Sequence, residues 1–94
     1  MTQEPKTKEE KIQYLKSCAT YITSNRGAII YGQYTLRENY FLLSDGTIAI
    51  RKWGTGKSID KMGIEDFAQR FGVEGLNYAI KQVKLKVGVP KNFP

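Results

Sequence analysis

The hydrophobic residues near the start of the chain recur at the spacing of an α-helix. They are Ile12, Leu15, Ala19 and Ile22, and Tyr14, Cys18 and Tyr21 widen the apolar stripe. The Asn-Arg-Gly sequence at 25–27 supplies a C-terminal stop, because glycine readily adopts the positive φ found after many helices. We therefore predict an N-terminal helix that begins near Lys8 and is stopped at 25–27.

The middle of the chain has the composition of β-strands. Residues 28–34 are β-branched and aromatic, and two further apolar runs, 40–44 and 47–53, flank Asp45 and Gly46. Asp-Gly suits a two-residue hairpin turn that requires positive φ. We therefore predict that these two runs pair as a hairpin.

Side chains in the second of these runs should alternate between the two faces of the sheet. Ile48 and Ile50 share one face, whereas Ala49, Arg51 and Trp53 share the other. We expect the first face to meet the helices and the second to be hydrated.

Helical spacing returns near the C-terminus. A first stripe consists of Ile64, Phe67, Ala68 and Phe71, and a second of Leu76, Ile80 and Val83. Gly72 separates the two stripes and predicts a pair of helices. From Val83 to 89, apolar residues also alternate with lysines and glycine, so this tail fits either a helix or a strand.

Together these patterns predict an α+β fold. The N-terminal helix and the C-terminal helical pair should cover one face of a short antiparallel sheet of about three strands. The 94 residues suit a single domain, with flexible tails at 1–7 and 90–94. No apolar run reaches the roughly 18–20 residues of a membrane span, and the one cysteine cannot form an internal disulfide. We therefore expect an intracellular (cytoplasmic) protein that does not act at a membrane.

The net charge of +6, from 15 basic and 9 acidic residues, favours an anionic partner, either nucleic acid or an acidic protein surface. Basic residues flank an aromatic one at 51–57, as a site that binds phosphates and stacks a base requires. The candidate nucleic-acid-binding residues are Arg51, Lys52, Trp53, Lys57, Lys81, Lys84 and Lys86. The alternative is that Trp53 caps the sheet and that the lysines keep a small domain soluble.

The sequence "GTGKS" at 54–58 matches only the end of a phosphate-binding loop. That motif requires glycine five positions before Gly56, where this chain has Arg51. We therefore interpret the segment as a flexible connection between the hairpin and the next helix, and we exclude nucleotide hydrolysis.

The segment 64–83 resembles a helix-turn-helix motif in its first half, where Ala68, Gly72 and Val73 have the expected spacing. Its second half departs from the motif, because Lys81 occupies a position that should be buried. Two ordinary core helices joined at Gly72 explain the same residues.

Six tyrosines are many for a chain of this length. Tyr31, Tyr34 and Tyr40 lie on or beside the predicted sheet, where they either fill the seam between helices and sheet or form a protein interface. The second function class is therefore a protein-binding regulator or inhibitor, which includes a homodimer formed through this face or through an open strand edge.

Catalysis has little support in the sequence. The chain has no histidine, and one cysteine cannot build a Cys/His metal site. Glu65 and Asp66 fall at a predicted helix start, where carboxylates complement the helix dipole. We therefore expect a non-catalytic binding module with no metal and no cofactor.

Overall fold

The computed structural model describes residues 5–87 and confirms the α+β class. Helix α1 (Lys8–Ala19) begins with a capping box. Thr7 Oγ1 accepts a hydrogen bond from the Glu10 amide at 3.1 Å, and Glu10 Oε1 accepts one from the Thr7 amide at 3.0 Å. The backbone amides of Thr7 and Lys6 hold the pKa of Glu10 below its ordinary value. Residues 1–4 and 90–94 of the expected tails lie outside the described residues.

Helix α1 is shorter than predicted, and Gly27 does not end it. Turns follow Ala19, although Ile22 still reaches the core. Gly27 instead lies where the chain enters the sheet, with a φ of 85°. A Cβ atom there would lie 2.6 Å from the carbonyl oxygen of Leu42, so the close approach of two backbones requires glycine.

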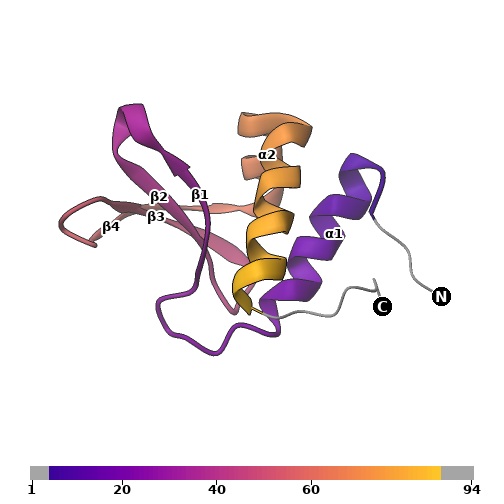
Figure 1. Cartoon of the computed structure of the whole chain (residues 1–94), viewed down its shortest axis with the longest axis horizontal. Coiled ribbons are helices and arrows are strands. Elements are labelled where there is room, and N and C mark those ends of the chain that lie inside the picture. The colour runs from indigo at the N-terminus through magenta and orange to yellow at the C-terminus, as the bar shows by residue number, and fades with distance from the viewer. Residues whose placement is uncertain (1–4, 88–94) are drawn as a thin grey trace.

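The sheet has four antiparallel strands in the order β1-β2-β3-β4. The strands are β1 (Ala28–Gln33), β2 (Glu38–Leu42), β3 (Thr47–Lys52) and β4 (Ser58–Gly63). Both helices lie on one side of the sheet, and the β1–β2 and β3–β4 connections project away from them at the other end (Figure 1). Strand β4 was not predicted, because it is an edge strand whose first four residues are exposed and show no apolar alternation.

The hairpin between β2 and β3 forms as predicted, but its turn differs. The Gly46 amide donates to the Leu43 carbonyl at 3.0 Å, and the Leu43 amide donates to the Thr47 carbonyl at 2.8 Å. Gly46 has a φ of 86°, whereas Asp45 does not have positive φ. This is the pattern of a three-residue loop ending in a left-handed glycine rather than a two-residue turn.

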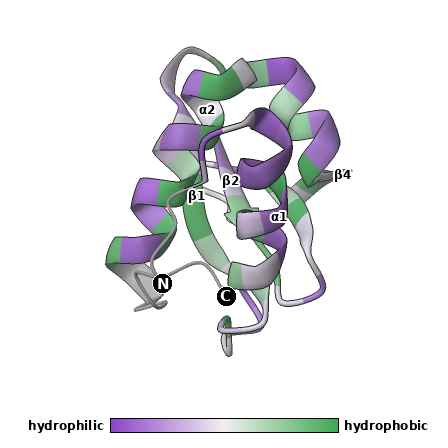
Figure 2. Cartoon of the chain, turned by 90° about the vertical axis from the view of Figure 1, so that its right-hand side faces the viewer, coloured by the Kyte–Doolittle hydropathy of each residue, from purple (hydrophilic) through white to green (hydrophobic). Residues whose placement is uncertain are grey.

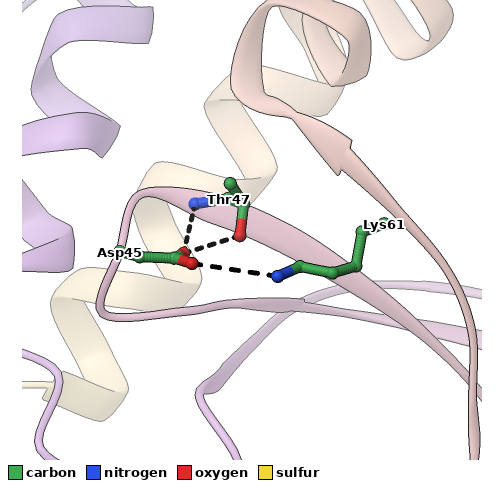
Figure 3. A network of polar contacts seen from close by, with 3 residues as sticks. All are labelled: Asp45, Thr47 and Lys61. Atoms are coloured by element: carbon green, nitrogen blue, oxygen red, sulfur yellow. Dashed lines mark hydrogen bonds and ion pairs between the residues drawn. The ribbon is translucent and has the colours of Figure 1, made fainter.

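Asp45 secures this loop through its side chain (Figure 3). Its Oδ1 atom accepts hydrogen bonds from the Thr47 amide at 2.9 Å and the Thr47 hydroxyl at 2.6 Å. Its Oδ2 atom lies 3.8 Å from the Lys61 ammonium on β4. The hydrogen bonds from Thr47 are the main reason that the pKa of Asp45 is lowered.

Helix α2 (Ile64–Val87) is kinked at Gly72, where φ is 72° and ψ is −168°. The predicted helical pair therefore exists without an intervening loop. The tail from Val83 is helical as far as Val87, and residues 88 and 89 lie outside the described part. Gly75 lets the second half pack closely on the first, since a Cβ atom there would lie 2.4 Å from Phe71 Cβ.

The core lies between the helices and the inner face of the sheet. In Figure 2 both helices alternate hydrophilic and hydrophobic residues around their axes, as amphipathic helices do. The fully buried large side chains include Tyr14, Leu15, Ile30, Tyr40, Leu42, Ile48, Ile64, Phe67, Leu76 and Val83. As predicted, Ile48 and Ile50 face this core. Within residues 5–87, no helix is long and apolar enough to cross a bilayer.

Candidate nucleic-acid interface

The face of the sheet opposite the helices, here called the outer face, carries the candidate site. Alternation along the strands places Phe41, Ala49 and Arg51 there, because their neighbours Tyr40, Ile48 and Ile50 belong to the core. Phe41 pairs with Ala49 across β2 and β3. Ala49 is buried, so this face has a small apolar floor of its own.

Two arginines converge on this floor. The Arg51 guanidinium carbon lies 4.7 Å from the centre of the Phe41 ring, and that of Arg26 lies 5.8 Å from the same centre. Such distances allow a cation–π attraction. Neither arginine forms an ion pair with a carboxylate of residues 5–87. The ring therefore holds two guanidinium groups whose charge is available to an anionic ligand.

The connection between α1 and β1 brings Arg26 to the outer face. Arg51 Nη1 donates a hydrogen bond of 2.6 Å to the Arg26 main-chain oxygen, which ties this connection to β3. The Arg26 side chain then extends toward the β3–β4 loop, where a Cβ atom on Gly56 would lie 3.1 Å from Arg26 Nη2. Glycine at 56 therefore leaves room for the guanidinium.

The "GTGKS" segment is the tip of the β3–β4 hairpin. The Gly56 amide donates to the Lys52 carbonyl at 3.0 Å, and the Lys52 amide donates to the Lys57 carbonyl at 3.1 Å. Gly54 and Gly56 have φ values of 84° and 67°, which glycine adopts without strain. The segment leads into β4 instead of a helix, which corrects the predicted connection and departs from a phosphate-binding loop.

An aromatic pair lies at the end of the sheet that carries the β3–β4 hairpin tip. The rings of Tyr34 and Trp53 meet edge to face, with centroids 5.5 Å apart and planes at 79°. Tyr34 is 76% exposed and Trp53 is 38% exposed. The Trp53 amide donates to the Arg37 carbonyl at 3.0 Å, which joins the two hairpins.

A row of outer-face residues connects this pair to Arg51. A Cβ atom on Gly32 would lie 3.9 Å from the Trp53 ring and 3.2 Å from Asn39 Oδ1. Asn39 in turn pairs with Arg51 across β2 and β3. The outer face thus runs from the Tyr34–Trp53 pair through Asn39 to the arginines on Phe41.

The predicted binding residues do not all converge. Arg51 and Trp53 belong to the outer face. The exposed Lys52 and Lys57 form the base of the hairpin tip, and alternation along β3 puts Lys52 on the same side of the sheet as Ile50, opposite to Arg51. Lys81, Lys84 and Lys86 instead belong to α2, on the other side of the core. Lys84 lies over the Tyr14 ring, with its Nζ atom 5.4 Å from the ring centre.

The three tyrosines proposed as a protein interface also lie in different parts of the structure. Tyr31 and Tyr40 belong to an aromatic cluster at the helix–sheet seam, together with Phe67 and Phe71. Tyr40 is fully buried, and its hydroxyl donates to Glu38 at 2.9 Å. Burial is the main cause that raises the pKa of Tyr40 to about 12, with a contribution from this bond. Only Tyr34 of the three is broadly exposed.

Sequence reasoning missed Arg26 and Phe41. Tyr40 and Leu42 are buried, and alternation along this strand therefore assigns Phe41 to the outer face. Arg26 gave no such signal, because its contact with Arg51 joins residues 25 positions apart. Its place in the sequence indicates only a helix end.

The described residues hold no group of His, Cys, Asp and Glu side chains that could bind a metal ion. Cys18 is buried in the core, and burial raises the pKa of its thiol to about 11. The thiol is therefore protonated at neutral pH and is a poor nucleophile. The chemistry that the outer face does offer is the binding of anions and the stacking of flat rings.

Comparison of the chain with models of protein families, with curated proteins and with solved structures finds no match.

Proposed function

We propose that this protein is a non-catalytic module that binds single-stranded nucleic acid on its outer face. The observation that carries the proposal is the combination of the two arginines on Phe41, which lack carboxylate partners within residues 5–87, with the exposed Tyr34–Trp53 pair. A phosphate backbone needs cations, and an unpaired base needs a flat aromatic surface. The outer face offers both within one stretch of sheet.

The two groups have different roles in this proposal. Arg26 and Arg51 contact phosphates, and Lys57 extends the positive charge toward the hairpin tip. Trp53 stacks on an unpaired base, an interaction that contributes about 1–3 kcal/mol. The fixed hydrogen bond from Arg51 reduces the ordering that binding would otherwise require.

The only tryptophan of the chain allows a direct test. Titration with a single-stranded oligonucleotide should quench Trp53 fluorescence, whereas a duplex of the same sequence should quench it much less. Poly-glutamate at equal charge controls for a general response to anions. Equal quenching by poly-glutamate would point to an acidic protein partner, and no response to any of the three would refute the proposal.

A protein-binding role is the second candidate, and the β1 edge of the sheet favours it. No charged residue occurs in β1 (Ala28–Gln33), whereas β4 carries Asp60 and Lys61. Exposed Tyr78 lies beside this edge, with its ring centre 5.6 Å from that of Tyr31. Uncharged edges accept an additional strand more readily than charged ones. Sedimentation that shows a stable dimer in the absence of nucleic acid would favour this role.

A further inference from the structure

A second basic surface lies on the helical side of the molecule. Lys11 of α1 and Lys81 and Lys84 of α2 line one shallow groove, here called the helical groove. Pro5, Asn77 and Ile80 complete its walls. Lysines from two elements that are distant in the sequence therefore meet at one place.

The groove keeps a positive character because acidic side chains of the helices gather elsewhere. Glu9, Glu10 and Glu65 line a different depression beside α1. Lys11 and Lys81 form no ion pair with a carboxylate of residues 5–87. On the same stripe of α2, Glu74 lies seven residues before Lys81, about 10 Å along the helix axis.

One of these lysines lies against an aromatic ring of the core. Lys84 is half-buried, and its ammonium group lies 5.4 Å from the centre of the buried Tyr14 ring. A lysine whose stem is packed loses less freedom when it binds a phosphate than a fully mobile one does. The amide of Asn77 adds a hydrogen-bonding group to the same groove.

The helical groove and the outer face lie on opposite sides of the hydrophobic core. The outer face belongs to β2 and β3, and the groove belongs to the helices that cover the other face of the sheet (Figure 1). A short strand bound at one surface is therefore separated from the other by the core. Each surface carries basic residues from two chain segments.

From this arrangement we infer that the protein has two separate phosphate-binding surfaces and holds two nucleic-acid segments together. The inference rests on the proposed function for the outer face and adds a bridging activity. None of the described residues that line the groove is aromatic, so it should contact the backbone of either single or double strands.

The experiment uses two oligonucleotides, one with a donor fluorophore and one with an acceptor, and the full chain. With about six nucleotides each, which is within the range that one small binding surface covers, the parent protein should bind two equivalents and produce energy transfer. The variant Lys11→Gln/Lys81→Gln should bind one equivalent and lose the transfer, while Trp53 fluorescence is still quenched. The matched control Lys16→Gln/Arg70→Gln removes the same charge from the same two helices and should retain the transfer.

The possible results separate the two proposals. Quenching of Trp53 with one equivalent bound and no energy transfer would overturn bridging and leave the outer face as a binding site. Energy transfer that persists in Lys11→Gln/Lys81→Gln would also overturn it, because the groove would not be the second surface. Absence of both quenching and binding would refute the proposed function and, with it, the inference. Sedimentation of each variant without oligonucleotide controls for bridging by a protein dimer, and a dimer would count against the groove.

Discussion

Arg51 donates a hydrogen bond from Nη1 to the main-chain oxygen of Arg26 at 2.6 Å, and both guanidinium groups lie over Phe41. This contact connects the end of the α1–β1 segment to the last residues of β3. It also brings two positive charges to one ring, which mutual repulsion disfavours in the absence of an anion. Binding of phosphate groups would relieve this repulsion, and for that reason we place the site here.

Gly46→Val should destabilise the protein. Gly46 has a φ of 86°, and a Cβ atom there would meet no other atom within 4 Å, so backbone strain and not a clash sets the cost. We expect a loss of about 1–3 kcal/mol in the free energy of unfolding, measured by urea denaturation. Gly46→Asn is the matched control and should lose less, because asparagine tolerates this conformation. Equal stability of the valine variant and the parent would contradict the described turn.

Gly75→Ala should also destabilise the protein, for a different reason. The added methyl group would lie 2.4 Å from Phe71 Cβ, inside a well-packed region. Overpacking of this kind costs about 1–3 kcal/mol, even though alanine favours helices more than glycine does. Introducing Gly75→Ala into the parent and into a Phe71→Gly background separates the two effects by thermal unfolding, because only glycine at 71 removes the Cβ atom that the new methyl group would meet. A rise in melting temperature for the single variant would contradict the close packing at the Gly72 kink.

The protein should lose stability in acid through identified carboxylates. The pKa values of Glu10, Asp45 and Glu65 are lowered in the folded state, first of all by hydrogen bonds from Thr7, Thr47 and Lys16 respectively. A lowered pKa contributes stability above the unfolded value, near pH 4, and this contribution disappears as the pH falls through the folded value.

Unfolding by urea between about pH 6 and pH 2 measures this loss. The variant Asp45→Asn should show a smaller decrease than the parent, because one of the three carboxylates no longer titrates. An identical decrease in both proteins would exclude Asp45 as a contributor.

Cys18 should react slowly with thiol reagents while the protein is folded. The residue is 3% exposed, and its thiol pKa is raised to about 11. Reaction with an aromatic disulfide at pH 8 should therefore be slow in buffer and fast in denaturant. Rapid reaction in buffer would show that α1 does not pack against the core as described.

The sequence predicted most elements of the fold, because their apolar residues repeat at regular spacing. The stripe from Ile12 to Ile22 and the alternation around Ile48 indicate which side of each element is buried. Strand β4 shows no such apolar pattern, since its residues at 58–61 are exposed. The turn at Asp45 was assigned from its two residues alone, whereas the hydrogen bonds of Leu43 and Thr47 extend the loop to three.

The candidate site was only partly predictable. Arg51, Lys52, Trp53 and Lys57 are close in sequence, so composition alone indicated a basic and aromatic surface. The sequence also assigns the lysines of α2 to that surface, because a linear sequence does not show that the sheet and core separate them. The participation of Arg26 depends on a long-range hydrogen bond, which no local pattern encodes.

The salt dependence of single-strand binding tests the central claim most directly. Each phosphate contact releases about 0.7 of a counterion from a single strand, so log affinity should fall linearly with log salt. Fluorescence anisotropy of a labelled oligonucleotide, from about 50 mM salt upward, measures this slope for the parent and for Arg26→Gln, Arg51→Gln, Arg70→Gln and Trp53→Ala.

Arg26→Gln and Arg51→Gln should each reduce the slope by about 0.7. Arg70→Gln should leave it unchanged, and Trp53→Ala should weaken binding by about 1–3 kcal/mol with little change in slope. Absence of binding at the lowest salt concentration, or an equal effect of Arg70→Gln and Arg51→Gln, would contradict the assignment of the outer face as the nucleic-acid interface.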